Sequence, residues 1–237
     1  MSSSIIFRRP ILKIALFAGL FAQGAAAFAQ NAPIDLRPKS PAPASKAIQN
    51  VAPPPRVAGQ NAAETLRAAN AYFNSIRTMA ASFSQQGADG RHTSGKLYLQ
   101  KPGKLRFVYD KPSPIDIIAD GTSVAIRNRR TAKQDLYYIS QTPLKFLLKQ
   151  QIDLSKDTKI LEIKNEGKFA LVRIEDKATF GGTSRIKLYF NPEPFTLSHW
   201  VVTDPQGYET RVELAQIDLK AKPDSGLFRI NYERLDN

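Results

Sequence analysis

The pattern that most constrains this chain is the regular alternation of apolar and polar residues from position 96 to position 126. Successive side chains of a β-strand point to opposite faces of a sheet, so this alternation predicts strands with one apolar face. Turn-forming pairs, Pro102-Gly103 and Asp120-Gly121, separate the runs. The apolar positions are Leu97, Leu99, Leu105, Phe107, Tyr109, Ile117, Val124 and Ile126. Four successive antiparallel strands with a continuous apolar face need a second layer to cover that face.

The rest of the chain continues this pattern, with strand-like runs at spacings of about 8–12 residues and turn residues between them. The predicted strands cover about residues 81–88, 94–100, 104–110, 114–119, 122–128, 134–139, 157–164, 168–176, 183–190, 196–203, 207–219 and 227–233. Because only two segments have helical character, the predicted class is mainly β with few helices. The arrangement expected is one large antiparallel sheet of about 11–12 strands, curled or closed, in a single domain at 61–237.

Two apolar helices are predicted to lie against this sheet. Asn61 and Glu64 form a capping-box pattern that starts a helix reaching about Met79. A second, short helix begins near Pro143, because proline fits a first helical turn. Its apolar residues are Leu144, Phe146, Leu147 and Leu148. They are too many for a surface connector of this length, so this segment, residues 143–149, is predicted to cover the sheet and is called the lid below.

The N-terminal residues predict export. Three basic residues precede an apolar run at 14–22 that is too short to span a bilayer as a helix, and Ala27-Phe28-Ala29 offers a small-x-small cleavage site. Residues 1–29 therefore predict a signal peptide cleaved near Ala29, with an uncleaved anchor as the alternative. Arg8-Arg9 also resembles a twin-arginine signal, which leaves the export route open. The expected location is the bacterial periplasm.

Composition limits the chemistry that follows the signal. Residues 30–60 hold seven prolines and few large apolar side chains, which predicts an extended linker. The sequence has no cysteine, so disulfides, thiolate metal sites and thiol nucleophiles are excluded. The net charge is +13, of which residues 61–237 carry +7. A basic domain of this kind can meet nucleic acid, anionic lipid or an acidic protein, and export argues against nucleic acid.

No arrangement of residues in the sequence indicates catalysis. His92 and His199 fall on separate predicted strands without partners at metal-ligand spacing. Asp116 and Asp120 could share a strand face like a catalytic carboxylate pair, but a turn explains Asp120 and the polar face explains Asp116. The nucleophile elbow, the phosphate loop and the zinc-protease motif are absent from the sequence. The chain is therefore expected to be no enzyme and to use no cofactor and no metal ion.

The order of several short motifs resembles one family. After the first helix come Ala81-Ser-Phe-Ser-Gln, Gly95-x-Leu-x-Leu, Lys101-Pro102, Leu105-x-Phe-x-Tyr, Ile118-Ala-Asp-Gly and Thr142-Pro143. Each motif alone is common, but their order and spacing across about residues 61–235 are similar to those of the periplasmic outer-membrane lipoprotein carrier protein (LolA) family.

This resemblance implies a fold and a function. The implied fold is an incomplete, strongly curved antiparallel β-barrel whose concave side is closed by short helices. Members of the family take acylated lipoproteins from an ATP-driven (ABC) transporter complex of the inner membrane, shield the acyl chains across the periplasm and pass them to an outer-membrane receptor. The implied cavity walls are Leu97, Leu99, Leu105, Phe107, Tyr109, Ile117, Val124, Ile126 and Trp200, and the implied lid residues are Pro143, Leu144, Phe146, Leu147 and Leu148. Plain core beneath the first helix is the alternative for each wall residue.

Three features depart from the family pattern. In many relatives an arginine bonds the lid closed at the position of Lys101, and lysine lacks the planar donor fork of arginine, so Lys101 and Arg106 are both candidates for the latch. The lid carries Lys145 where an apolar residue often lies. The chain ends at Asn237 without the extended C-terminal segment of some relatives, so one-way delivery is not implied.

Two other functions stay open at this level. The same half-barrel could serve as a periplasmic module that senses lipid or lipoprotein without ferrying it, because a fold does not fix a function. A cell-envelope hydrolase would need a polar cleft near Asp116, whereas a carrier needs a dry, apolar concavity. The sequence shows no heptad pattern, so a monomer is expected.

Overall fold

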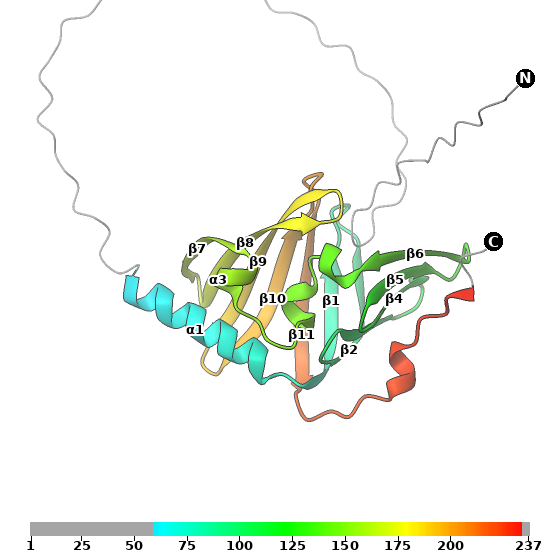
Figure 1. Ribbon diagram of the computed structural model, residues 1–237, viewed down its shortest axis with the longest axis horizontal. Helices are drawn as coiled ribbons and strands as arrows, with labels where there is room; N and C mark the ends of the chain where they lie inside the picture. Colours follow the sequence, from blue (N-terminus) through cyan, green and yellow to red (C-terminus); the bar gives the residue numbers. More distant parts are fainter. Residues whose placement is uncertain (1–58, 234–237) are drawn as a thin grey trace, which may run out of the picture.

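The computed structural model describes residues 59–233, and Figure 1 shows them as one curved sheet with helices on its concave side. The predicted signal peptide at 1–29 and the predicted linker as far as residue 58 lie outside the described residues. Within 59–233, none of the helices combines the length and the apolar character that crossing a membrane requires.

Eleven antiparallel strands form a single sheet in the order β6-β5-β4-β3-β2-β1-β11-β10-β9-β8-β7. Their bounds are β1 Thr78–Gln86, β2 His92–Gln100, β3 Lys104–Tyr109, β4 Ile115–Asp120, β5 Ser123–Asn128, β6 Lys133–Tyr138, β7 Lys159–Glu166, β8 Phe169–Thr179, β9 Gly182–Pro192, β10 Phe195–Thr203 and β11 Glu209–Asp218. Two meanders, β1 to β6 and β7 to β11, are joined where β1 pairs with β11. Because β6 and β7 remain as edges, the sheet curls without closing, and the predicted mainly β, incomplete barrel is confirmed.

The register across the strands explains why the alternating residues form one continuous face. Leu97 lies opposite Phe107, and Phe107 lies opposite Ile117 on its other side. Ile117 in turn lies opposite Ile126, which completes an apolar row across four strands. Side chains aligned in this way point to the same face of a sheet, so one row becomes a wall.

Helices and one long connection cover that wall. The helix α1 (Gly59–Ser75) packs its buried Ala69 and Phe73 into the core cluster of the sheet. The connection from β6 to β7 contains a short 3-10 helix, η1 (Ile139–Gln141), and two four-residue helices, α2 (Lys145–Leu148) and α3 (Leu154–Asp157). In Figure 1 this connection, in green, lies on the concave side of the sheet beside α1. The core therefore lies between the concave face and these helices.

The two predicted helices differ from the observed ones in their lengths. The first was expected to reach Met79, but α1 ends at Ser75 and β1 begins at Thr78. Burial alternates along β1, so the apolar residues at 79, 81 and 83 belong to the strand period and not to the helix period. The second was expected over about seven residues, and the structure has α2 over four and an additional α3, which was not predicted.

The predicted strand at 227–233 is wrong. Residues 225–228 form a 3-10 helix, η2 (Ser225–Phe228), and the segment after it lies on the convex face, where Ile230 packs against Ile118 and Ala125. The Arg106 guanidinium donates a hydrogen bond to the Leu227 carbonyl oxygen at 3.3 Å. Because β11 already has β10 and β1 as neighbours, it offers no free edge to a twelfth strand. Residues 219–233 therefore follow the last strand of the sheet.

Gly95 is required by a close approach of two strands, which yields a first prediction. A Cβ atom at this position would lie 2.0 Å from the Val108 carbonyl oxygen and 2.9 Å from the Phe83 ring. Gly95→Ala is expected to lower the free energy of unfolding by about 3 kcal/mol or more in urea titrations, because backbone must move to make room. The neighbouring Ser94→Ala, which loses one exposed hydrogen bond to Asp110, should cost under about 1 kcal/mol. Equal stability of the two variants would contradict this packing.

Candidate functional site

The concave face and the lid meet in one apolar cluster. The structure places eight of the nine predicted wall residues inside this cluster, and the ninth, Ile126, is partly buried and packs against it. The apolar lid residues Leu144, Phe146, Leu147 and Leu148 belong to the same cluster. The predicted wall and lid residues therefore share one buried cluster, and their role as an acyl-chain cavity stays a prediction.

Aromatic rings lie at the centre of this cluster. The ring of Phe146 on the lid is 5.7 Å from that of Phe73 on α1 and 6.0 Å from that of Trp200 on β10, both in edge-to-face geometry. The indole Nε1 of Trp200 is buried without a hydrogen-bond partner. Because Phe146 fills the space between the first helix and the sheet, it marks the point where removal of the lid would open the interior.

A small cavity borders the lid in this closed arrangement. A cavity of about 10 Å³ lies between the lid, α3 and β8–β9, which is room for about one water molecule. Its lining comprises Pro143, Lys145, Phe146, Lys149, Ile152, Leu154, Asp157, Thr158, Ile174, Asp176 and Ile186. A larger apolar guest can enter only if the lid side chains leave the positions that they occupy here.

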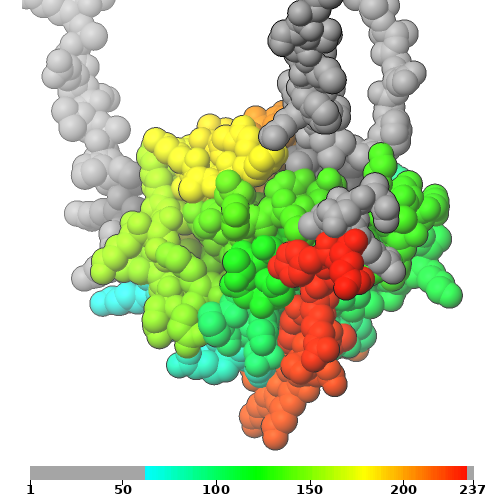
Figure 2. Space-filling model, turned by 45° about the vertical axis from the view of Figure 1, so that its right-hand side comes forward, coloured from blue at the N-terminus to red at the C-terminus, as the bar shows by residue number. Residues whose placement is uncertain are grey.

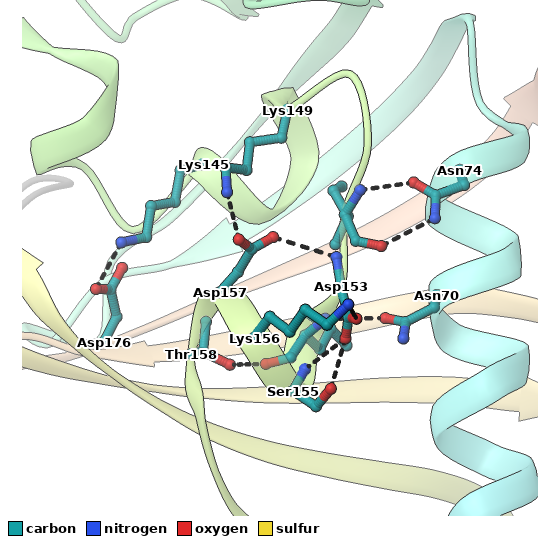
Figure 3. Close-up of polar contacts among 12 residues, drawn as sticks. Asn70, Asn74, Lys145, Lys149, Asp153, Ser155, Lys156, Asp157, Thr158 and Asp176 are labelled. Carbon is teal, nitrogen blue, oxygen red and sulfur yellow. Dashed lines mark hydrogen bonds and ion pairs between the residues drawn. The ribbon is translucent and has the colours of Figure 1, made fainter.

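An ion pair fastens the lid to the sheet. The Lys145 ammonium on α2 lies 2.7 Å from a carboxylate oxygen of Asp176 on β8, and the two side chains are only 15% and 4% exposed (Figure 3). The same oxygen accepts a hydrogen bond from the Ala178 amide. A backbone bond from the Gly103 amide to the Leu148 carbonyl, at 2.9 Å, holds the other end of α2. The lid is thus held at both ends by polar contacts.

Two asparagines of α1 clamp the segment that follows the lid. The Asn74 amide group both donates to the Ile152 carbonyl at 2.9 Å and accepts from the Ile152 amide at 2.8 Å. Asn70, one helical turn earlier, accepts from the Leu154 amide at 3.0 Å. Figure 3 shows both side chains pointing from α1 toward this backbone. The segment at 152–154 is therefore fixed to α1, while α2 is held mainly through its ion pair and end contacts.

The two predicted latch residues lie elsewhere. The Lys101 ammonium donates to the Phe73 carbonyl at 2.6 Å, so it holds the C-terminal part of α1 and not the lid. Burial, and less strongly the charge of Arg77, lowers the pKa of Lys101 to about 8. Arg106 lies on the convex face, with its guanidinium 3.4 Å from the Asp116 carboxylate. The geometry therefore assigns the ion pair of the lid to Lys145, which sequence reasoning noted only as unusual.

The other candidate polar residues lie outside the concave site. Asp116 is on the convex face, where Arg106 and Arg129 lie within 3.5 Å of its carboxylate. His199 stacks on Tyr189 with ring centroids 4.2 Å apart, and burial, then Arg211, lowers its pKa to about 4. Within the described part of the chain, no group of three or more histidine or acidic residues could hold a metal ion. These residues pack and pair on the outer surface.

The sequence of this chain is similar to those of known proteins. The family model for the outer membrane lipoprotein carrier protein LolA matches residues 74–231. A protein named outer-membrane lipoprotein carrier protein from Legionella pneumophila (strain Lens) is 31% identical over 183 residues, which cover 74% of this chain and 88% of that protein. The protein of the same name from Methylibium petroleiphilum is 24% identical, covering 70% and 84%.

The chain belongs to the LolA family. This is a family of lipoprotein carriers, and the family resemblance predicted from the sequence motifs is confirmed.

Solved structures with a similar fold share little sequence with this LolA-family chain. A LolA superfamily protein from Nitrosomonas europaea has a TM-score of 0.37 at 9% identity, covering 70% of this chain and 98% of that one. An uncharacterized conserved protein from Thermus thermophilus has a TM-score of 0.42 at 12% identity, covering 74% and 97%.

The Lys145–Asp176 pair yields a prediction about the motion of the lid. Asp176→Asn keeps an oxygen that can accept from the Ala178 amide but removes the charge, which leaves the ammonium buried without a counterion. We expect amide hydrogen exchange at 145–148 to become at least about tenfold faster, equivalent to about 1.4 kcal/mol. Lys156→Met, which breaks an exposed pair with Asp153, is the control and should leave this exchange unchanged. Equal exchange in both variants would show that the pair does not restrain the lid.

The lowered pKa of Lys101 predicts a pH effect. Its pKa is about 8 in the folded chain and 10.5 as the ordinary value, so the unfolded chain binds more protons between pH 8 and pH 10. Stability contributed by this residue therefore rises with pH across that window. Urea midpoints of the wild type relative to Lys101→Met should increase from pH 8 to pH 10. A constant difference would mean that Lys101 is solvated in the folded chain.

Proposed function

We propose that this chain is a periplasmic carrier that shields the acyl chains of lipoproteins between the concave sheet face and the lid. The observation that carries the proposal is the packing of the lid. Its apolar side chains are buried in the core cluster of an open half-barrel, and polar contacts at its ends hold it there. A segment of this kind can be exchanged for an apolar guest.

The free energy of exposing an acyl chain to water determines how strongly a carrier must shield it. At about 0.8 kcal/mol per CH₂ group, one sixteen-carbon chain exposed to water costs on the order of 12 kcal/mol. A rigid, empty cavity would bind such a chain too tightly to release it. Here the guest must displace Phe146 and Leu147, which are 3% and 1% exposed in the closed state, so part of its binding energy is spent on opening the lid. That competition favours reversible binding.

The walls suit non-directional recognition. The predicted wall residues are aliphatic or aromatic and bring no charge, and all but Trp200 lie on the neighbouring strands β2 to β5. Such surfaces bind acyl chains of different lengths and make no contacts that depend on the sequence of the attached polypeptide. The proposed cargo is therefore a class, acylated lipoproteins, whose common feature is the lipid.

The family relationship supports the remaining steps of the proposal. The carrier would receive cargo from a lipoprotein-releasing ABC transporter complex of the inner membrane and deliver it to an outer-membrane receptor. The signal peptide proposed at 1–29 would place it in the periplasm, and the chain would act as a monomer. The carrier function requires no catalytic group, cofactor or metal ion.

The proposal is tested by release of cargo from membranes. Inner-membrane vesicles loaded with a tri-acylated lipoprotein and the exporting complex are given ATP and purified residues 30–237, and the soluble fraction is assayed for a one-to-one complex. Leu147→Glu and Phe107→Glu should reduce this complex at least about tenfold, because they place a charge where acyl chains would lie. Leu219→Glu, a change at a surface residue that is 39% exposed, is the matched control and should leave it unchanged.

Two results would contradict the proposal. If a folded wild-type chain leaves all cargo in vesicles whose exporting complex is active, the chain is not a carrier. If it forms the complex but never passes cargo to outer-membrane vesicles, a module that senses lipoprotein is the better account. Thermal unfolding of each variant shows which losses reflect the cavity and which reflect a failure to fold; Leu147→Glu changes the lid without changing the sheet.

A further inference from the structure

The β8–β9 hairpin contacts the lid region at two places. Its strands are eleven residues each, the longest among the described elements of the sheet, and its tip comprises Phe180, Gly181 and Gly182. On β8, Asp176 holds Lys145 of the lid. At the tip, the Phe180 amide donates to the Gln141 carbonyl at 2.7 Å, just before the lid begins. This one hairpin therefore holds both the start of the lid connection and the ion pair of α2.

The tip of the hairpin exposes an aromatic side chain. Phe180 is 48% exposed although its ring lies 5.4 Å from that of Tyr137. Figure 2 shows the hairpin, in yellow, at the surface of the molecule. Tyr138 at the end of β6 and Tyr208 in the adjoining β10–β11 turn are 63% and 49% exposed. Pro205 of that turn lies against Gly182, within 3.4 Å of where a Cβ atom would be. Exposed aromatic residues thus gather at this end of the sheet.

The exposed charges of the hairpin are cationic. Lys177 is exposed, and the side chain of Arg185 is 60% exposed. The two carboxylates of the hairpin, Glu175 and Asp176, are only 12% and 4% exposed and lie in ion pairs, Glu175 with Arg185 at 3.6 Å and Asp176 with Lys145 of the lid. An approaching partner therefore meets an aromatic tip flanked by positive charge. Aromatic rings favour the boundary between lipid and water, and lysine and arginine beside them favour anionic headgroups.

We infer that the tip of the β8–β9 hairpin docks on the surface of an anionic phospholipid bilayer and that docking releases the lid. Phe180 enters the interfacial layer, and Lys177 and Arg185 lie against the headgroups. This inference rests on the proposed carrier function, because it gives acyl chains a short path between bilayer and cavity.

The contacts of the tip explain how docking reaches the lid. When Phe180 enters the bilayer, its ring leaves Tyr137 and its amide leaves the Gln141 carbonyl. Asp176 lies on β8, four residues before Phe180, so a shift of the tip also strains its bond to Lys145. A bilayer that binds the displaced hairpin more strongly than the closed one shifts the equilibrium toward the open lid. The lid then opens where acyl chains can leave or enter lipid.

Vesicle binding tests the docking step. Residues 30–237 are sedimented with vesicles of phosphatidylcholine containing phosphatidylglycerol and with vesicles of phosphatidylcholine alone, at low and high salt. We expect binding to the anionic vesicles, weakened by salt, and a loss of about tenfold for Phe180→Ser. Leu219→Ser is the matched control, because Leu219 is 39% exposed but follows the opposite end of β11. The inference would be overturned if the chain bound neither kind of vesicle, which is the result expected if the tip binds an acidic protein instead. It would also be overturned if Phe180→Ser and Leu219→Ser lost equal binding.

A reporter on the lid tests the coupling. The chain has no cysteine, so Gln150→Cys, at an exposed residue directly after the lid, provides one labelling site for an environment-sensitive fluorophore. Anionic vesicles should change its emission in the otherwise native chain and leave it unchanged with Phe180→Ser. If the chain binds the vesicles and the emission does not change, docking does not release the lid, and the proposed coupling is overturned.

Binding of a soluble acylated peptide, measured without vesicles, separates this inference from the proposed function. Phe180→Ser should retain that binding, because Phe180 is not in the apolar cluster of the cavity. Retained peptide binding with no vesicle binding by the native chain would refute the docking alone. Absence of peptide binding in the native chain would refute the carrier itself.

Discussion

An apolar concave face on an open sheet must be covered, and the rest of this structure depends on how that covering is held. The edges β6 and β7 do not pair, so the sheet cannot bury its inner face by closing into a barrel. The connection between those two edges crosses the opening instead and brings Phe146 and Leu147 into the core. Burial of apolar surface gives about 25 cal/mol per Å² without regard to direction, so an acyl chain can replace these side chains at similar energy. The covering is therefore exchangeable in a way that a twelfth strand, fixed by backbone hydrogen bonds, would not be.

Directional contacts decide which part of the covering can move. The side chains of Asn70 and Asn74 fix the segment at 152–154 to α1 through hydrogen bonds to the backbone of that segment. The lid depends instead on the buried ion pair of Lys145 with Asp176, an exposed ion pair of Lys149 with Asp157 on α3, and a backbone bond at the end of α2. A buried ion pair repays the cost of desolvation only while both partners stay in place, so it favours either a closed lid or a fully separated one. This division gives a fixed end at α3 and a releasable end at α2.

Local sequence patterns could place the apolar residues on one sheet face but could not predict the polar contacts of the lid, for identifiable reasons. Alternation has a period of two in any strand, so Leu97, Phe107 and Ile117 could be assigned to one face without knowing the fold. The lid was found from its excess of leucine and phenylalanine. The partner of Lys145 lies 31 residues away on β8, and nothing near either residue signals that pairing. Alternation also cannot tell which strands are neighbours, so residues 227–233 were predicted as a strand after β11, although β11 already pairs on both sides. Lys101 was interpreted from the family pattern, whereas its contact with Phe73 depends on where α1 ends.

The central claim is that the lid must leave the interior before an acyl chain can enter. The most direct measurement joins the lid to β8 reversibly. Lys145→Cys and Asp176→Cys place the only two thiols of the chain on either side of the closure, where a short reducible thiol cross-linker can bridge them. Binding of an acylated peptide is then measured before and after reduction. The account predicts no binding while the cross-link is intact and full binding once it is reduced. Equal binding in both states would show that the acyl chain lies elsewhere and would contradict the account.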